Sequence, residues 1–221
     1  MPRRNLVLAN NEIYHIFNRS IARENIFSNK IYLKKVLEII HFYRFPQQLR
    51  LSKFKALNEI QKKDYLLALK DKSPLVEIYS FALMPNHYHL LLKQLQDNGI
   101  VRFIANFQNS FAKIFNLKNE RNGAVFQNSF KAKRVETDEQ FIHISRYIHL
   151  NPVTAYLISF NQLANYPWTS FPIYVNEDKN SFVAVNFLLH LFGSKDKYAD
   201  FVADQVSYQR ELALIKDLIL E

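Results

Sequence analysis

Cysteine is absent from the 221-residue sequence and glycine is scarce, and each shortage excludes a class of chemistry. Without cysteine, the chain can form no disulfide, no thiolate zinc site and no cysteine nucleophile. The three glycines, Gly99, Gly123 and Gly193, lie too far apart to form a phosphate-cradling loop or a dinucleotide-binding fingerprint. Functions that need a nucleotide cofactor are therefore disfavoured, and a reducing cytoplasm fits the absence of cysteine.

Long apolar runs are missing too. Every apolar run is much shorter than a membrane span, and the first residues lack the apolar stretch of a secretory signal. Apolar residues make up 48% of the chain and charged residues 22%, which are ordinary values for a globular protein. We therefore expect a soluble, cytoplasmic protein with no membrane partner, built as one domain or as a compact domain with a helical tail.

Negative charge is scarce in the first 135 residues. They carry 23 Lys/Arg against 9 Asp/Glu, whereas residues 136–221 carry 6 against 11, within a net charge of +9. A basic body suits a polyanion such as nucleic acid, because each phosphate that it neutralises releases condensed counterions. The alternative is a basic surface that only maintains solubility, and charge alone does not choose between the two.

Apolar periodicity and turn residues predict the order of the secondary-structure elements. The expected elements are a strand at residues 12–17, helices at 30–44 and 53–69, a hairpin with strands at 75–83 and 87–93, a helix at 99–115, a strand at 125–135 and a helix at 138–150. Residues 181–191 and 196–220 look helical and acidic, which predicts a C-terminal tail. This order is typical of an α+β fold, in which an antiparallel sheet carries helices packed on one face.

Two histidines in the second strand of the hairpin are the first candidates for a functional site. Side chains alternate faces along a strand, so His87 and His89 point the same way while Tyr88 points to the opposite face, where we expect it to be buried. Two neutral imidazoles can hold a divalent ion and leave positions for an oxygen ligand and a substrate phosphate. On this spacing alone, exposed or hydrogen-bonded strand histidines are the simpler interpretation.

The surrounding sequence changes that interpretation. Residues 81–92, FALMPNHYHLLL, resemble the histidine–hydrophobe–histidine strand of single-tyrosine HUH transposases, in particular the REP-associated tyrosine transposases of the IS200-like group. Weaker similarities occur at residues 13–19, 125–131 and 166–170, in the family's order, so the resemblance covers about residues 10–172. Tyr88 is a mild departure, because the family usually has an aliphatic residue between the two histidines.

A second segment, residues 146–153 with the sequence RYIHLNPV, resembles the part of the family that bears the nucleophilic tyrosine. The resemblance implies that Tyr147 is the catalytic residue; without it, Tyr147 would be interpreted as a core aromatic, one of 12 tyrosines. A tyrosine hydroxyl has a reference pKa of about 10, so it is a poor nucleophile unless the phosphate is strongly polarised. Mg²⁺ or Mn²⁺ held by His87 and His89 would supply that polarisation.

The resemblance also implies the fold and the reaction. We expect a ferredoxin-like HUH nuclease core over residues 1–172 and a helical C-terminal extension over residues 173–221. The implied activity is cleavage and rejoining of single-stranded or hairpin DNA through a 5′-phosphotyrosine and a free 3′ hydroxyl, by a monomer or a homodimer. Rejoining needs no ATP, because the covalent bond preserves the phosphodiester energy.

Asn151 follows Tyr147 by four residues, where the family commonly has an oxygen donor that completes the metal site. One helical turn would place both side chains on the same face. Alternatively, Asn151 caps a following helix that begins at Pro152. His143 could also face the site, although a core or surface position is the simpler interpretation, and His149 should point away from Tyr147.

Residues 130–135, FKAKRV, interleave basic and apolar side chains. On a strand, Lys131 and Lys133 would share a face and could follow a phosphate backbone, whereas Arg134 would lie on the other face. The alternative is a charged strand edge that prevents aggregation. Three further cations near the start of the chain are candidate nucleic-acid ligands: Arg3, Arg4 and Arg19.

Two other functions compete with a transposase. The first is a non-catalytic, domesticated relative that binds a DNA or RNA hairpin by its shape. The second is a relative of replication initiators or relaxases, which commonly add a third metal-binding histidine or a second tyrosine. Residues 85–89 have no such added histidine motif beside them, which disfavours that second class.

Overall fold

The computed structural model describes residues 6–176 and 181–206, and a four-stranded antiparallel sheet forms its centre. The strands lie in the order β2-β3-β1-β4, with β1 at Ile13–Arg19, β2 at Val76–Met84, β3 at His87–Gln94 and β4 at Lys131–Val135. The predicted α+β class, an antiparallel sheet with helices, is confirmed. Within the described ranges, every helix is too short or too polar to span a lipid bilayer.

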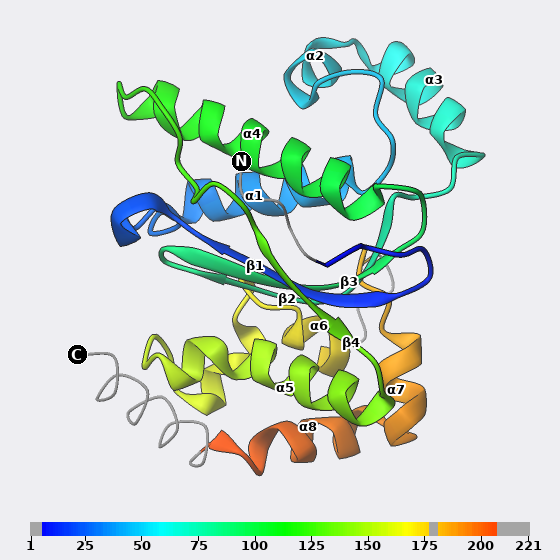
Figure 1. Cartoon of the computed structure of the whole chain (residues 1–221), viewed down its shortest axis with the longest axis vertical. Coiled ribbons are helices and arrows are strands. Elements are labelled where there is room, and N and C mark those ends of the chain that lie inside the picture. Colours follow the sequence, from blue (N-terminus) through cyan, green and yellow to red (C-terminus); the bar gives the residue numbers. More distant parts are fainter. Residues whose placement is uncertain (1–5, 177–180, 207–221) are drawn as a thin grey trace.

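Helices cover both faces of this sheet (Figure 1). One face carries α1 (Lys30–Tyr43) and α4 (Gly99–Lys118), and the other carries α5 (Asp138–Thr154), α6 (Phe171–Asn176), α7 (Asn186–Phe192) and α8 (Lys195–Ala203). The sequence predicted helices on one face only, and this detail needs correction. The physical reason is that β2 and β3 are buried along nearly their whole length, so both of their faces require a cover.

The register of the central strands brings their side chains to one end of the sheet. Met84 pairs with His87, so Pro85 and Asn86 alone connect β2 to β3. On the other side of β3, β1 runs antiparallel, with Phe17 opposite His89 and Arg19 opposite His87. Because directly paired residues point to the same face, the odd-numbered positions of β1 share a face with the two histidines.

The predicted helix at residues 53–69 divides in two. α2 spans Leu51–Ala56, and α3 spans Glu59–Lys70. Asn58 separates them, because its side chain accepts a hydrogen bond from the main-chain N–H of Gln61 while the Gln61 side chain bonds back to Asn58. This capping box starts a new helix instead of continuing the old one.

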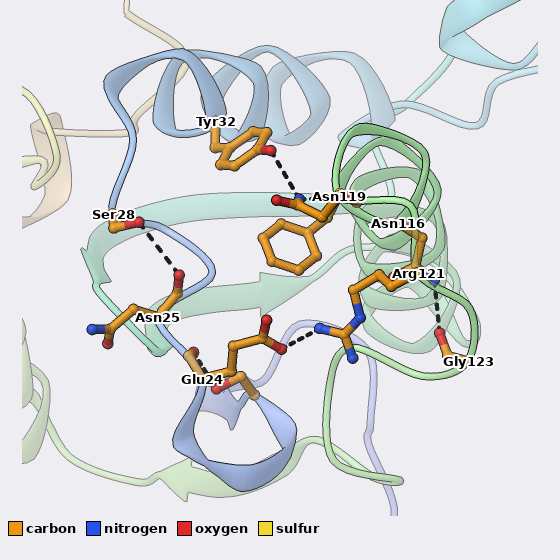
Figure 2. A network of polar contacts seen from close by, with 10 residues as sticks. Glu24, Asn25, Ser28, Tyr32, Asn116, Asn119, Arg121 and Gly123 are labelled. Carbon is orange, nitrogen blue, oxygen red and sulfur yellow. Dashed lines mark hydrogen bonds and ion pairs between the residues drawn. The ribbon is translucent and has the colours of Figure 1, made fainter.

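The chain after β1 is tied to the loop that follows α4 (Figure 2). A short 3-10 helix, η1 (Ile21–Arg23), leads to Glu24, which forms an ion pair with Arg121. Nearby, the Asn119 amide donates a 2.9 Å hydrogen bond to the hydroxyl of Tyr32 on α1. These contacts hold the end of β1 in place.

Only the second half of the strand predicted at residues 125–135 forms β4. Phe126 makes an isolated bridge with Ser20, and regular pairing with β1 starts at Lys131. Between them, the main-chain N–H of Gln127 donates a 2.9 Å hydrogen bond to the carbonyl of Arg19. The intervening chain therefore folds over the end of β1 instead of extending the sheet.

α5 begins where the sequence predicts and ends later. The side chain of Thr137 accepts a 3.1 Å hydrogen bond from the N–H of Gln140, which caps the first turn. The helix was expected to end near residue 150, but it continues through Pro152 to Thr154. Proline removes one helical N–H, but Pro152 and Val153 are both buried, and this burial favours the last turn despite that loss.

The described residues beyond position 172, which are 173–176 and 181–206, pack on the same face of the sheet as α5. A 3-10 helix, η2 (Phe160–Asn165), precedes α6, and farther on Val183 forms a bridge with Ile78 of β2. Of the predicted helix at 181–191, only α7 forms, and α8 represents the start of the helix expected at 196–220. The remainder of that prediction, beyond residue 206, lies outside the described residues.

Candidate functional site

A pocket of about 380 Å³ opens where the ends of β1 and β3 meet α5 and the start of β4. Side chains from all four elements and from the loop before β4 line it: Phe17, Asn18, Arg19, His87, His89, Gln127, Lys131 and Tyr147. The pocket therefore contains the three residues that the sequence analysis placed at the centre of the proposed chemistry, together with two of the predicted cations.

His87 and His89 lie side by side in this pocket. Their ring centroids are 5.1 Å apart, and each uses its Nδ1 atom within the protein. Nδ1 of His87 is 2.7 Å from Oδ1 of Asn86, and Nδ1 of His89 is 2.9 Å from Nε2 of His15. Within the described parts of the chain, the Nε2 atom of neither ring has a hydrogen-bond partner, so Nε2 is the atom that each ring can offer to a ligand.

Both imidazoles are in environments that favour the neutral form. Burial lowers the pKa of His87 to about 4, and the positive charge of Arg19 adds to this effect. The pKa of His89 is also well below its ordinary value, first through burial and then through the charges of His15, His87 and Arg19. Neutral rings at pH 7 keep the lone pairs that a cation needs.

The donor set fits a divalent cation with open coordination positions. Among the described residues, no three His, Asp or Glu side chains converge on one point that could hold a metal ion. A cation at the histidine pair would therefore draw its remaining ligands from a side-chain amide, water or a substrate phosphate.

Tyr147 reaches the pocket from the middle of α5. Its ring packs edge-on against His89 and His15, with centroid distances of 5.6 Å and 6.0 Å. The residue keeps 39% of its surface exposed. Burial of the remainder raises the pKa of Tyr147, while a hydrogen bond with the Asn151 side chain and the charge of Arg19 act in the opposite direction.

Asn151 lies one helical turn after Tyr147, inside α5. The alternative in which Asn151 caps a new helix at Pro152 is wrong, because both residues belong to the continuous α5. The other two histidines of this helix lie elsewhere. His143 is 2.7 Å from the Arg146 guanidinium, and His149 is fully buried on the side away from the pocket, as predicted.

The predicted nucleic-acid ligands occupy three different places. Arg19 and Lys131 line the pocket, and Lys133 pairs with His15 on the same face of the sheet. Arg134 lies on the opposite face, where it forms a 2.8 Å ion pair with Glu12. Arg3 and Arg4 lie outside the described residues.

The sequence analysis missed one buried histidine and several polar residues of the pocket. His15 has only 7% of its surface exposed, beside His89. The sequence contained a pattern that could have identified His15, because strand alternation places it on the same face as Phe17 and Arg19. Gln127 gave no such signal, because it lies in a loop; its carbonyl accepts a 3.0 Å hydrogen bond from the Asn18 amide.

Comparisons with known proteins identify the family and the fold of this chain. A family model described as transposase IS200-like matches residues 9–151. A solved structure of a REP-associated tyrosine transposase bound to a REP hairpin covers 84% of this chain and 92% of its own, with 15% identity and a TM-score of 0.53, which shows a shared fold. A candidate transposase from Deinococcus radiodurans R1 shares 12% identity over 66% of this chain and 95% of its own, with a TM-score of 0.37. No curated protein matches the sequence.

Proposed function

The chain belongs to the IS200-like transposase family, and on that premise we propose that it cleaves and rejoins single-stranded, hairpin-bearing DNA with Tyr147 as nucleophile. One observation supports the proposal above all others. The Tyr147 phenol, the His87 and His89 imidazoles and the Arg19 guanidinium line a single pocket that is open to solvent. A nucleophile, a cation site and a phosphate-binding charge are the parts that such a reaction requires.

Hairpin DNA is the proposed substrate. The solved relative with the same fold is bound to a REP hairpin. In this chain, Arg19 and Lys131 extend positive charge from the pocket along β4 toward Lys133. Cations along a strand edge can follow a phosphate backbone without reading its bases. These residues therefore suit a strand that enters the pocket from the β4 side.

The proposed cleavage step is a transesterification. The Tyr147 oxygen attacks the phosphorus, the bond from phosphorus to the 3′ oxygen breaks, and the phenolic proton is released. The departing 3′ oxygen takes up a proton and becomes a free hydroxyl, while the 5′ phosphate remains attached to Tyr147. Arg19 favours the phenolate by its charge, which opposes the effect of burial on the pKa of Tyr147. Rejoining reverses the step.

His87 and His89 would hold Mg²⁺ or Mn²⁺ through their Nε2 atoms, and Asn151 would add an amide oxygen. The cation, when bound, supplies charge that polarises the phosphate and stabilises the leaving oxygen. The protein's own contribution is to keep both rings neutral and to hold their Nδ1 atoms in hydrogen bonds, so that the rings are oriented before the cation arrives.

The test is formation of a covalent adduct. The full chain is incubated with Mn²⁺ and a labelled single-stranded hairpin, and a denaturing gel reports any protein–DNA adduct. We expect an adduct that Tyr147→Phe abolishes, while binding of the same hairpin in a native gel persists. Tyr166→Phe is the matched control, because Tyr166 lies outside the pocket lining.

The outcomes separate the competing functions. An adduct that survives in Tyr147→Phe would remove Tyr147 from the role of nucleophile. Tight hairpin binding without an adduct under any divalent cation would instead indicate a domesticated, non-catalytic binding protein. Cleavage of a replication-origin sequence in preference to hairpins would favour a relative of replication initiators.

A further inference from the structure

We propose that His15 is a positioning residue for the cation site: it accepts the Nδ1 proton of His89 and so leaves the Nε2 lone pair of His89 available to a divalent cation. This inference rests on the proposed function only in its assumption that His87 and His89 hold a cation. His15 lies 74 residues away from His89 in the chain, yet their ring nitrogens are 2.9 Å apart.

The contact between these two rings is buried and well defined. His15 and His89 expose only 7% and 6% of their surfaces. The ring planes are inclined by only 24° and the centroids are 5.1 Å apart, so the two rings meet edge to edge through these nitrogens, and Phe17 packs beside both. A polar pair this well shielded from water has a strong preference for a satisfied hydrogen bond.

Proton counting makes the direction of this hydrogen bond matter. A neutral imidazole carries one N–H, and one proton lies between Nδ1 of His89 and Nε2 of His15. If His89 donates, its Nε2 atom is an unprotonated ligand. If His15 donates, His89 must carry its own proton on Nε2 and cannot bind a cation through that atom. Cation binding therefore requires His15 to act as the acceptor.

A comparison with His87 shows why His89 in particular depends on an acceptor for its Nδ1 proton. Nδ1 of His87 faces Oδ1 of Asn86, which can only accept a hydrogen bond. The Asn86 amide nitrogen donates to the carbonyl of Arg23 at 3.2 Å, which fixes the orientation of the amide. The tautomer of His87 is therefore set by an obligate acceptor, whereas that of His89 is set by His15, a residue that can act either way.

The role predicts a specific order among substitutions at position 15. His15→Gln keeps an oxygen that can accept the His89 proton, whereas His15→Phe keeps a ring of similar shape without any acceptor. Loss of a hydrogen-bond partner behind a metal-binding histidine typically weakens metal affinity about 10- to 100-fold. We expect that loss in His15→Phe and a largely restored affinity in His15→Gln.

The experiment measures Mn²⁺ affinity of the full chain without DNA at pH 7.5, by the electron paramagnetic resonance signal of free Mn²⁺. His87→Ala reports loss of a direct ligand, and His143→Phe is the matched control, because His143 bonds to Arg146 outside the pocket. Thermal unfolding of each variant without Mn²⁺ separates a change in affinity from a change in stability. A merely structural role would alter the unfolding temperature, but His15→Gln would then bind Mn²⁺ no more tightly than His15→Phe.

The outcomes distinguish this inference from the proposed function. If the unmodified chain binds no Mn²⁺, or if His87→Ala binds as tightly, the cation site itself is refuted. If the site is present but His15→Phe binds Mn²⁺ as the unmodified chain does, or His15→Gln binds as weakly as His15→Phe, then His15 is not the acceptor. Should His15→Phe fail to fold, ¹⁵N NMR of the unmodified chain with Mg²⁺ decides: a proton on Nε2 of His89 contradicts the inference.

Discussion

The amide nitrogen of Asn151 donates a 2.8 Å hydrogen bond to the main-chain carbonyl of Tyr147, one helical turn earlier. This bond holds the Asn151 side chain against the turn that carries the proposed nucleophile. Donation of the second amide hydrogen to the phenol oxygen favours the phenolate, which agrees with the lowering effect of Asn151 on the pKa of Tyr147, and it leaves the amide oxygen as the atom that could bind a cation.

Asn151→Ala should therefore weaken Mn²⁺ binding about 10-fold or more while the helix remains intact, because alanine is the better helix former. Free Mn²⁺ measured by electron paramagnetic resonance checks the affinity, and circular dichroism checks the helix. Asn151→Asp, which keeps the oxygen, should bind Mn²⁺ at least as tightly as the unmodified chain. Equal affinity in all three proteins would make Asn151 a helix residue with no part in the site.

Replacing a pocket cation should change the salt dependence of DNA binding. Arg19→Gln or Lys131→Gln removes one phosphate contact, so the slope of log K against log salt concentration should decrease by about 1 for each. Hairpin binding measured between low and moderate salt gives this slope. Binding should weaken similarly for unrelated hairpin sequences, because a phosphate contact reads no base.

Lys63→Gln on α3 is the matched control for that experiment, since it removes the same charge from an exposed position remote from the pocket. Arg134→Gln is informative as well. Arg134 lies on the opposite face of the sheet in an ion pair with Glu12, so its slope should resemble that of the control. A decrease of slope in Lys63→Gln equal to that in Arg19→Gln would show that only net charge matters.

The stability of the protein should decrease as pH falls below about 6.5. Burial lowers the pKa of His149 to about 3, against an ordinary value of 6.5 in the unfolded chain. Between these values the unfolded state binds one proton more than the folded state, so this contribution is complete above pH 6.5 and is lost toward pH 3. The urea concentration at the midpoint of unfolding should fall from pH 7.5 to pH 5.5 and again to pH 4.5. His149 should contribute up to about 1.4 kcal/mol per pH unit to the accompanying fall in the free energy of unfolding.

His149→Gln isolates this contribution. The variant should be less stable than the unmodified chain at pH 7.5, because it disturbs hydrogen bonds with Ser170 and Tyr198, but its stability should depend less on pH. The two stability curves should therefore approach each other at low pH. The two curves would instead stay parallel if the pKa of His149 in the folded protein were not lowered.

The sequence predicted the parts of this site that depend on strand alternation and helical spacing. His87 and His89 share a face because they are two residues apart on a strand, and Tyr147 and Asn151 share a face because they are one helical turn apart. Both placements are local, so each motif could be interpreted without knowledge of the fold. The residues' chemical roles remain predictions.

The contacts that the sequence did not predict are long-range. His15 touches His89 only because β1 pairs with β3 in one particular register, and a shift by one residue would move His15 to the other face. The helices on both faces of the sheet were missed for a similar reason. Periodicity shows that a strand such as β2 is apolar, but not which distant helix covers each face.

A buried hydroxyl connects the C-terminal region to the helix that bears Tyr147. The hydroxyl of Tyr198 on α8 lies 2.9 Å from Oγ of Ser145 and 2.6 Å from Nδ1 of His149, and Ser145 also contacts Oγ of Ser80 at 2.8 Å. Tyr198 is completely buried, so water cannot replace a lost partner. The network therefore links α8, α5 and β2 through mutually dependent hydrogen bonds.

Tyr198→Phe should lower the free energy of unfolding by about 1–3 kcal/mol, because Oγ of Ser145 and Nδ1 of His149 each lose one buried hydrogen-bond partner. Ser145→Ala should have a similar effect, and the double variant should lose less than the sum of the two, since both changes break the same bond. Urea unfolding at pH 7.5 measures all four proteins. Tyr156→Phe, at a side chain that is 62% exposed, should stay within about 0.5 kcal/mol. Strictly additive losses would show that the hydroxyls of Tyr198 and Ser145 act independently, and that α8 does not hold α5 through this network.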